Sequence, residues 1–181
     1  MHELILGGAR SGKSRVAEAR AAAWLATPGR SAVLVATALA GDSEMQERIA
    51  RHRADRRARV PLLATREEPL ALPEVLEQAA PDKLLIVDCL TLWMTNLHMP
   101  AHGRPLLDAE ARESALVTAL AAAPGPVVLV SNEIGLGVMP ISAEARRFVD
   151  AIGRLHQRVA AVCERVTLMV AGIEVPVKGP R

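Results

Sequence analysis

The amino-acid sequence predicts an α/β protein in which helices cover both faces of a mostly parallel sheet. Short runs rich in valine, leucine and isoleucine recur between longer segments of helical pattern, as in repeated strand and helix units. These runs are apolar throughout and do not alternate with polar residues, which is typical of strands covered on both faces. A glycine-rich motif directly after the first run also favours this class, because phosphate-binding loops lie between a strand and a helix.

The same patterns give approximate bounds for the elements. Strands are expected at 4–6, 32–36, 83–87, 126–130 and 165–171, and helices at 13–26, 43–57, 70–80, 108–123 and 142–164. A last run, 173–178, follows Ala171-Gly172 too closely for a crossover helix, so it should pair antiparallel with the preceding strand. Residues 99–105 include two prolines and a glycine and are expected to form a loop.

Length and composition exclude several classes of protein. The 181 residues suit a single domain, 1–181, that buries roughly 70% of the surface of the unfolded chain. With 22 basic and 20 acidic residues, the formal charge of +2 gives no reason to expect a nucleic acid or an anionic membrane as partner. Two cysteines are too few for a disulfide framework, and no apolar run reaches the roughly 18 residues of a membrane span. We therefore expect a cytoplasmic protein without a membrane span.

The glycine-rich motif predicts a site for the phosphates of ATP or GTP. It reads Gly7-Gly8-Ala9-Arg10-Ser11-Gly12-Lys13-Ser14 and has the P-loop spacing. The glycines let backbone amides turn onto phosphate oxygens, and the following helix presents the positive end of its dipole. Lys13 would neutralise the β and γ oxygens, and Ser14 would hold Mg²⁺. The alternative is a glycine-rich turn that matches by chance, but the order of strand, loop and helix argues against it.

An acidic residue at the end of a neighbouring buried strand is the second part of such a site. Leu84-Leu85-Ile86-Val87-Asp88 supplies one, so Asp88 is the expected carboxylate on the metal side. An aspartate at a strand end can also cap the next helix, and the two roles can coexist.

A histidine lies within the most basic helix of the predicted fold. Six arginines occur between Arg48 and Arg59, and Met45, Ile49 and His52 fall on one helical face. Such a helix can be a solvated or nucleic-acid-facing surface that contains a structural histidine. Alternatively, His52 is a nucleophile that attacks an α-phosphate to form a phosphoramidate, while arginines stabilise the anionic transition state. Composition does not choose between these two interpretations.

Taken together, the motifs resemble the bifunctional adenosylcobinamide kinase and adenosylcobinamide-phosphate guanylyltransferase family of cobalamin biosynthesis. The matching segments span nearly the whole chain in order, which a generic P-loop protein would not reproduce. They are Gly7 to Arg15, Val35 to Thr37, Asp42-x-Glu44-Met45, Arg48-Ile49-x-x-His52-Arg53, Thr65-x-Glu67-Glu68-Pro69, Val87 to Trp93, Thr95-Asn96-Leu97, and Ser131 to Gly135 with Gly137 and Pro140.

The resemblance implies two reactions and a RecA-like P-loop NTPase fold that assembles as a homotrimer. ATP or GTP phosphorylates adenosylcobinamide, and GTP then guanylylates a histidine that passes GMP to adenosylcobinamide phosphate. Carried over residue by residue, His52 and Lys13 are catalytic, and Mg²⁺ is held by Ser14 and Asp88. The implied nucleotide contacts are Gly7 to Ser14, Ala36, Thr37, Ala38, Arg53, Ala54, Asp55, Arg56, Glu67 and Asp88.

Some positions depart from the family pattern or permit two interpretations. The family usually has Arg-Pro and then a tryptophan where this chain has Arg56 to Pro61, so the contacts on the guanine side are unassigned. Val149 and His156 also depart from the pattern and receive no role. Glu133 follows a predicted strand at the ligand-binding edge of the sheet and could order substrate or a metal-bound water, or it could belong to a plain loop before a helix.

Two other functions remain compatible with the fold and the P-loop. A RecA-like ATPase could bind nucleic acid through the arginine-rich helix, and DNA or RNA would then stimulate hydrolysis. A monofunctional small-molecule kinase would keep the P-loop and have no histidine chemistry.

Overall fold

A computed structural model describes residues 1–39, 43–100 and 106–179. Within them the chain forms, in order, β1 (His2–Gly7), α1 (Lys13–Leu25), β2 (Ser31–Ala36), α2 (Ser43–Arg59), β3 (Ala64–Glu67), α3 (Leu72–Leu76), β4 (Lys83–Asp88), α4 (Leu90–His98), α5 (Ala109–Ala122), β5 (Val127–Asn132), α6 (Ala143–Val162), β6 (Arg165–Val170) and β7 (Ile173–Lys178). Among the helices that the structure describes, none combines the length and the apolar character that crossing a membrane requires.

The described strands form one seven-stranded sheet in the order β3-β2-β4-β5-β1-β6-β7. All neighbouring pairs are parallel except β6 and β7, so the predicted antiparallel closing strand is confirmed. Ala171 and Gly172 link these two strands with φ angles of 51° and 82°. Positive φ at both central residues is the geometry of a tight hairpin turn, which explains why two residues suffice.

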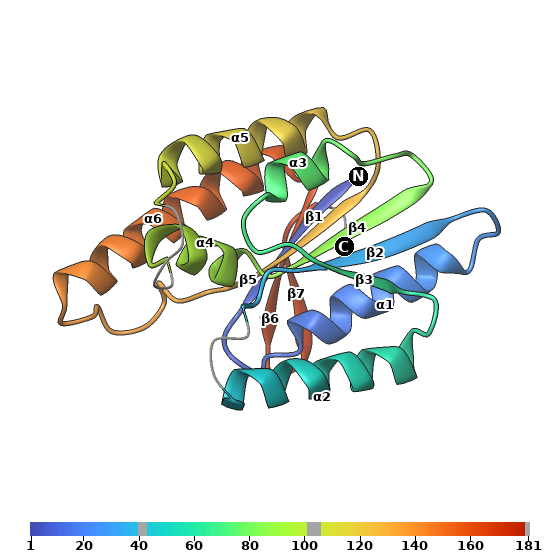
Figure 1. Cartoon of the computed structure of the whole chain (residues 1–181), viewed down its shortest axis with the longest axis horizontal. Helices are drawn as coiled ribbons and strands as arrows, with labels where there is room; N and C mark the ends of the chain where they lie inside the picture. The colour runs from blue at the N-terminus through green and yellow to red at the C-terminus, as the bar shows by residue number, and fades with distance from the viewer. Residues whose placement is uncertain (40–42, 101–105, 180–181) are drawn as a thin grey trace.

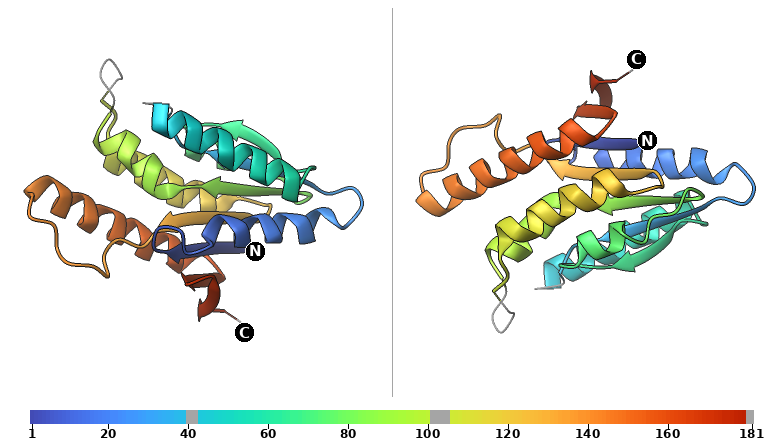
Figure 2. Two further views of the ribbon diagram at one scale, coloured as in Figure 1. Left: turned by 90° about the horizontal axis from the view of Figure 1, so that it is seen from below. Right: turned by 90° about the horizontal axis from the view of Figure 1, so that it is seen from above.

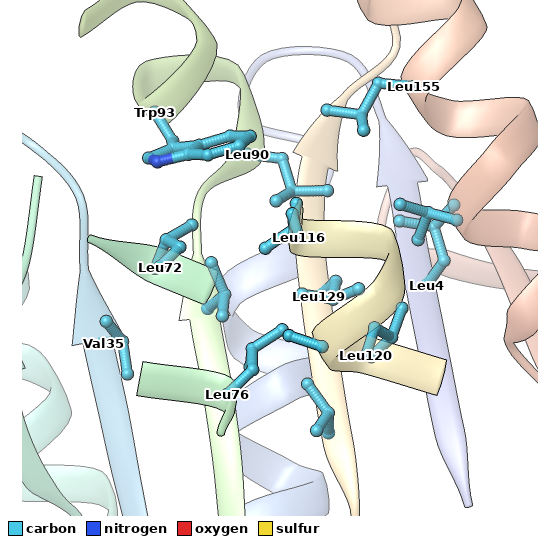
Figure 3. Packing of buried hydrophobic residues seen from close by; sticks show 14 of the residues in the cluster. Leu4, Val35, Leu72, Leu76, Leu90, Trp93, Leu116, Leu120, Leu129 and Leu155 are labelled. Atoms are coloured by element: carbon cyan, nitrogen blue, oxygen red, sulfur yellow. The ribbon is translucent and has the colours of Figure 1, made fainter. Parts of the chain in front are cut away.

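Helices cover both faces of the sheet, as the unbroken apolar runs predicted (Figures 1 and 2). On one face, α3, α4, α5 and α6 pack over a cluster that includes Leu4, Leu85 and Trp93, part of which is drawn in Figure 3. On the other face, Ala17 and Ala21 of α1 pack with Ile5 and neighbouring strand residues. Successive strand residues such as Leu4 and Ile5 therefore enter opposite cores, as the pleat of a strand requires.

Two elements were not predicted, and one helix is shorter than predicted. The edge strand β3 is exposed and polar, so it has no apolar run to mark it. Helix α4 has only nine residues and is buried on most of its surface, which leaves no contrast between an apolar and a polar face. Helix α3 ends at Leu76 rather than near 80, because the backbone at Ala80 turns to bridge Lys83. Most of the loop predicted at 99–105, and Asp42 of the quoted motifs, lie outside the described residues.

The strand order brings chemically important strand ends to one edge of the sheet. Because the strands are parallel, the residues that follow them share that edge. Gly7 at the end of β1 lies in register with Asn132 at the end of β5. Ala36 at the end of β2 lies in register with both Glu67 and Asp88. This edge is where open α/β sheets bind ligands.

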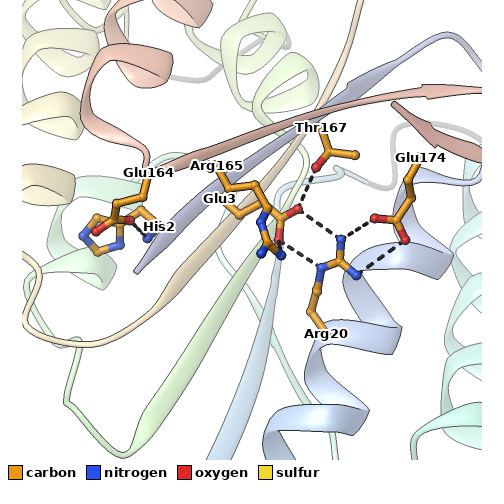
Figure 4. A network of polar contacts seen from close by, with 7 residues as sticks. All are labelled: His2, Glu3, Arg20, Glu164, Arg165, Thr167 and Glu174. Atoms are coloured by element: carbon orange, nitrogen blue, oxygen red, sulfur yellow. Dashed lines mark hydrogen bonds and ion pairs between the residues drawn. The ribbon is translucent and has the colours of Figure 1, made fainter. Parts of the chain in front are cut away.

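A buried carboxylate ties the first strand to its neighbours at the side of the sheet (Figure 4). Glu3 on β1 is 1% exposed and accepts hydrogen bonds from Arg20 Nε at 3.0 Å and Nη2 at 3.2 Å, and from Thr167 Oγ1 at 2.8 Å. Arg20 also contacts Glu174 of β7. One guanidinium therefore joins α1, strand β1 and the antiparallel edge strand β7.

Replacing Arg20 by methionine should lower the free energy of unfolding by about 3 kcal/mol, because it leaves the buried Glu3 carboxylate without its main partner. Chemical denaturation of the nucleotide-free protein measures this loss. Arg15→Met is the matched control, since Arg15 lies exposed on the same helix. Equal stability of the two variants would contradict a structural role for the Glu3 network.

Candidate functional site

The predicted phosphate loop occupies the turn between β1 and α1. Gly7 and Gly12 have φ angles of 154° and 99°, which side chains disfavour, and a Cβ at Gly7 would lie 2.6 Å from the carbonyl oxygen of Met169. The turn between β6 and β7 supports the loop from outside, because the Gly172 amide donates to Ser11 O at 3.0 Å. Gly12 caps α1 without a side-chain hydrogen bond, and the first turn of the helix has no acidic residue. The helix start is therefore suited to an anion.

Lys13 lies inside this loop. Its side-chain ammonium donates to the carbonyl oxygens of Gly7 at 2.8 Å and Gly8 at 2.7 Å, and the residue is 8% exposed. Burial lowers the pKa of Lys13, and the nearby Cys89 and Asp88 partly oppose this shift. A third contact of the ammonium, to Ser11 Oγ, is longer at 3.5 Å. A buried cation held by such neutral oxygens can exchange them for anionic phosphate oxygens, which bind it more strongly.

Ser14 and Asp88, the two predicted metal ligands, are joined by a hydrogen bond. Burial raises the pKa of Asp88, while a hydrogen bond with Ser14 and electrostatic interactions with Arg56 and His52 oppose the rise. One carboxylate and one hydroxyl, with nucleotide phosphates and water completing the shell, are typical Mg²⁺ ligands. Within the described part of the chain no group of three or more His, Cys, Asp or Glu residues could hold a metal without such help.

His52 and Arg56 of α2 both interact electrostatically with Asp88. They are four residues apart and therefore share one side of the helix. His52 is exposed, whereas Arg56 is 7% exposed and donates to Thr65 Oγ1 at 3.2 Å. The end of α2 is fixed by Arg59, whose Nε donates to Glu18 of α1 at 2.7 Å. The structure thus brings the predicted nucleophile near the predicted metal ligands.

The other residues predicted on α2 have different surroundings. Arg53 forms an ion pair with Glu67 at the end of β3, and both side chains are about half exposed. Ala54 and Asp55 are exposed as well, and Ala54 lies roughly 200° around the helix from His52. The structure therefore pairs Arg53 with the end of β3 and leaves Ala54 and Asp55 exposed to solvent.

The segment after β2 is engaged in the backbone of the sheet edge. Thr37 is fully buried, and its Oγ1 donates to Cys89 O at 2.7 Å and accepts from the Cys89 amide at 2.9 Å. Asn96 Nδ2 donates to Thr37 O at 2.9 Å. Burial raises the pKa of Cys89 to about 11, so its thiol stays protonated at neutral pH. Ala36 and Ala38 flank Thr37 and are partly buried.

Sequence reasoning missed a buried polar group behind the P-loop. His156 of α6 contacts Ser131 at the end of β5, and Ser131 contacts Thr91 of α4. A signal was present, because His156 follows Ile152 by four residues and precedes Val159 by three on the buried side of α6. Glu133, which received two interpretations, follows this strand end directly.

Two cavities lie near the ligand-binding edge. One, of about 390 Å³, is lined by the P-loop residues Gly8 to Ser11, by Glu133 and Leu136, and by Leu168 to Ala171. The other, of about 470 Å³, lies between the end of α4 and the first half of α6 and includes His98, Phe148 and Arg154. The first adjoins the phosphate loop, whereas the second lies between the two helices.

Comparisons with known proteins find relatives that match nearly the whole chain. Residues 3–177 match the sequence model of a family described as cobinamide kinase / cobinamide phosphate guanyltransferase. The bifunctional adenosylcobalamin biosynthesis protein CobP of Pseudomonas aeruginosa is 51% identical over 180 residues, which cover 99% of this chain and 98% of that protein. The bifunctional adenosylcobalamin biosynthesis protein CobU of Salmonella typhimurium is 37% identical, with 97% and 98% covered.

A solved structure supports the fold class. The flagellar accessory protein FlaH from Methanocaldococcus jannaschii aligns with a TM-score of 0.54 and covers 98% of this chain and 78% of that chain. At 11% identity the likeness concerns the fold alone. It agrees with the predicted RecA-like P-loop fold and its mostly parallel sheet.

Proposed function

Because the chain belongs to the cobinamide kinase / cobinamide phosphate guanyltransferase family, we propose that one P-loop site serves both of its transfers and that His52 carries GMP between them. The protein is a bifunctional enzyme of adenosylcobalamin biosynthesis. The nucleic-acid-dependent ATPase and the monofunctional kinase are set aside on that ground. The observation that carries the proposal is that the exposed His52 shares one side of α2 with Arg56 and that both interact electrostatically with Asp88. An imidazole there can meet a nucleotide whose phosphates lie on the P-loop.

In the kinase step, the hydroxyl of adenosylcobinamide attacks the γ-phosphorus of ATP or GTP, and the nucleoside diphosphate leaves. Lys13 would exchange its contacts with Gly7 and Gly8 for phosphate oxygens, where its charge opposes the negative charge of the transition state. Ser14 and Asp88 would hold Mg²⁺, which would supply positive charge to stabilise the transferring phosphate.

In the guanylyl transfer, a ring nitrogen of His52 attacks the α-phosphorus of GTP and pyrophosphate leaves. A phosphate oxygen of adenosylcobinamide phosphate then attacks the same phosphorus, and the bond to His52 breaks to give adenosylcobinamide-GDP. Two displacements allow the corrinoid to enter after pyrophosphate has left. Arg56 would support both displacements, because its guanidinium lies on the same side of α2 as His52 and can stabilise the transferring phosphate.

The remaining nucleotide contacts are proposed in two groups. Gly7 to Ser14 would bind phosphates through backbone amides. Arg53 and Glu67, which pair with each other at the end of β3, would contact the base or ribose together with Ala54 and Asp55. Thr37 has its hydroxyl bound to Cys89, so we propose that it and its neighbours Ala36 and Ala38 contribute shape and backbone atoms.

We also propose the wider setting of the enzyme. Residues 1–181 would act as one kinase and guanylyltransferase domain, supported by the single sheet that runs from β3 to β7. A cytoplasmic location is supported by two buried cysteines that carry free thiols.

A homotrimer is supported by the resemblance and by the apolar loop after β5, where Val138 and Ile141 are 98% and 99% exposed. Light scattering on the purified protein would measure the oligomeric state.

Two neighbouring arginines of α2 test which side of the helix serves the reaction. Arg56→Met should lower guanylyl transfer by about 10²-fold, because it removes a cation from the transferring phosphate. Arg57→Met should leave the rate unchanged, since Arg57 is exposed on another side of α2. The measurement is formation of adenosylcobinamide-GDP from the phosphorylated corrinoid and GTP, with corrinoid phosphorylation by ATP as the control for folding. An equal loss in both variants would contradict the proposed orientation.

A further inference from the structure

A carboxylate that the proposed mechanism does not use lies beside the P-loop. Glu133 follows β5, and its backbone amide donates to Gly7 O at 3.0 Å, so the residue is fixed at the start of the phosphate loop. Its side chain lines the 390 Å³ cavity together with residues of that loop. Among the residues that line this cavity, Glu133 supplies the carboxylate, whereas Asp88 lies outside the lining and is bound to Ser14.

Two contacts hold the Glu133 side chain. Oε1 accepts a hydrogen bond from the Gly135 amide at 2.6 Å, within the loop that follows β5. Oε2 lies 3.9 Å from Nδ1 of His156, which belongs to α6. The glutamate is therefore held from its own loop and from the helix that packs behind the strand.

His156 is itself held by hydroxyl groups at the sheet edge. Its Nε2 lies 2.8 Å from Ser131 Oγ, which lies 3.1 Å from Thr91 Oγ1. Thr91 Oγ1 accepts the Asn132 amide at 2.8 Å, so this chain of contacts ends at the strand residue beside Gly7. Burial lowers the pKa of His156, and the charge of Glu133 partly opposes that shift. A neutral ring that accepts at Nε2 from Ser131 carries its proton on Nδ1, facing the carboxylate.

We propose that Glu133 accepts the proton of the attacking corrinoid hydroxyl in the kinase step, and that His156 is the positioning residue that aims it. As the hydroxyl oxygen bonds to the γ-phosphorus, its proton passes to a carboxylate oxygen of Glu133. The bond between the γ-phosphorus and the bridging oxygen breaks, and its electrons leave with the nucleoside diphosphate. Solvent takes the proton from Glu133 when the products leave.

The two reactions differ in their need for such a group. The kinase acceptor is a hydroxyl that must lose a proton, whereas the acceptor of GMP is a phosphate oxygen that is already anionic. Loss of Glu133 should therefore damage the kinase selectively. This inference rests on the proposed use of one P-loop site by both reactions. A selective loss of the kinase also distinguishes a catalytic role of Glu133 from a structural one, which would affect both reactions.

Glu133→Gln tests the role with a residue of nearly the same shape. The kcat of corrinoid phosphorylation should fall by about 10²- to 10⁴-fold, the usual contribution of a general base. GMP transfer from GTP to previously phosphorylated corrinoid should stay at the wild-type rate in the same preparation, and Glu110→Gln, on an exposed glutamate of α5, should affect neither rate. A wild-type kinase kcat, or equal losses of both activities, would overturn the proposal.

The position of His156 is tested by a double-mutant cycle. His156→Leu should lower the kinase kcat by about tenfold when Glu133 is present and cause no further loss in the Glu133→Gln background, because the two residues act as one unit. His156→Asn should recover part of the rate, since an amide can still contact Ser131. An equal loss in both backgrounds would overturn the positioning role. Failure of His52 to carry GMP would leave these kinase rates interpretable, because corrinoid phosphate is measured directly.

Discussion

Lys13→Ala is expected to abolish both activities, lowering kcat/KM for corrinoid phosphorylation and for GMP transfer by about 10³-fold each. The ammonium lies inside the P-loop, bonded to the carbonyl oxygens of Gly7 and Gly8. Phosphates of either nucleotide would replace those contacts, so one substitution removes the main cation from both transition states. The measurement is the rate of each half reaction under single-turnover conditions.

The matched control is Lys83→Ala. Lys83 begins β4 at the opposite end of the strand from Asp88, so both rates should remain at the wild-type level. Thermal unfolding should show that Lys13→Ala still folds. The substitution removes a buried cation, but it also removes the energetic cost of keeping that cation away from water. Retention of either activity by Lys13→Ala would contradict a single shared phosphate site.

His52→Ala is expected to eliminate GMP transfer while sparing corrinoid phosphorylation. Without the imidazole no covalent intermediate forms, and the loss should reach the detection limit of the assay. His52 is exposed on α2, so its removal should cost little packing. Arg51→Ala, the exposed neighbour on the same helix, should keep both activities. An equal loss of kinase activity in His52→Ala would mean that the histidine serves the shared phosphate site rather than only the GMP transfer.

Much of the fold followed from local patterns in the sequence. Unbroken apolar runs marked the buried strands, and the short spacing at Ala171-Gly172 required the antiparallel β7 that the structure contains. The polar edge strand β3 lacked such a pattern, since an edge strand exposed to solvent is stabilised by pairing with β2 rather than by burial. The strand order could not be read from local patterns, because it depends on packing between distant segments.

The candidate site also has parts that local sequence patterns predict and parts that depend on tertiary packing. The P-loop and Asp88 were predictable because each is a short motif at the end of a strand. The nearness of His52 to Asp88 was not, because it depends on how α2 lies against α1 through Arg59 and Glu18. Helical periodicity puts Arg56 on the side of His52, whereas Arg53 points to Glu67. His156 departs from the family pattern, so sequence reasoning assigned it no role. Its contacts with Ser131 and Glu133 in the structure indicate that it positions the Glu133 side chain.

The central claim is that His52 carries GMP beside a P-loop that serves both reactions. The most direct measurement incubates the purified protein with Mg²⁺ and GTP labelled in the α-phosphate, and then assays the intact chain for bound label. The predicted result is label that is acid-labile and alkali-stable, that is absent from His52→Ala and from Lys13→Ala, and that passes to added corrinoid phosphate. An unlabelled wild-type chain, or label that persists in His52→Ala, would contradict the account.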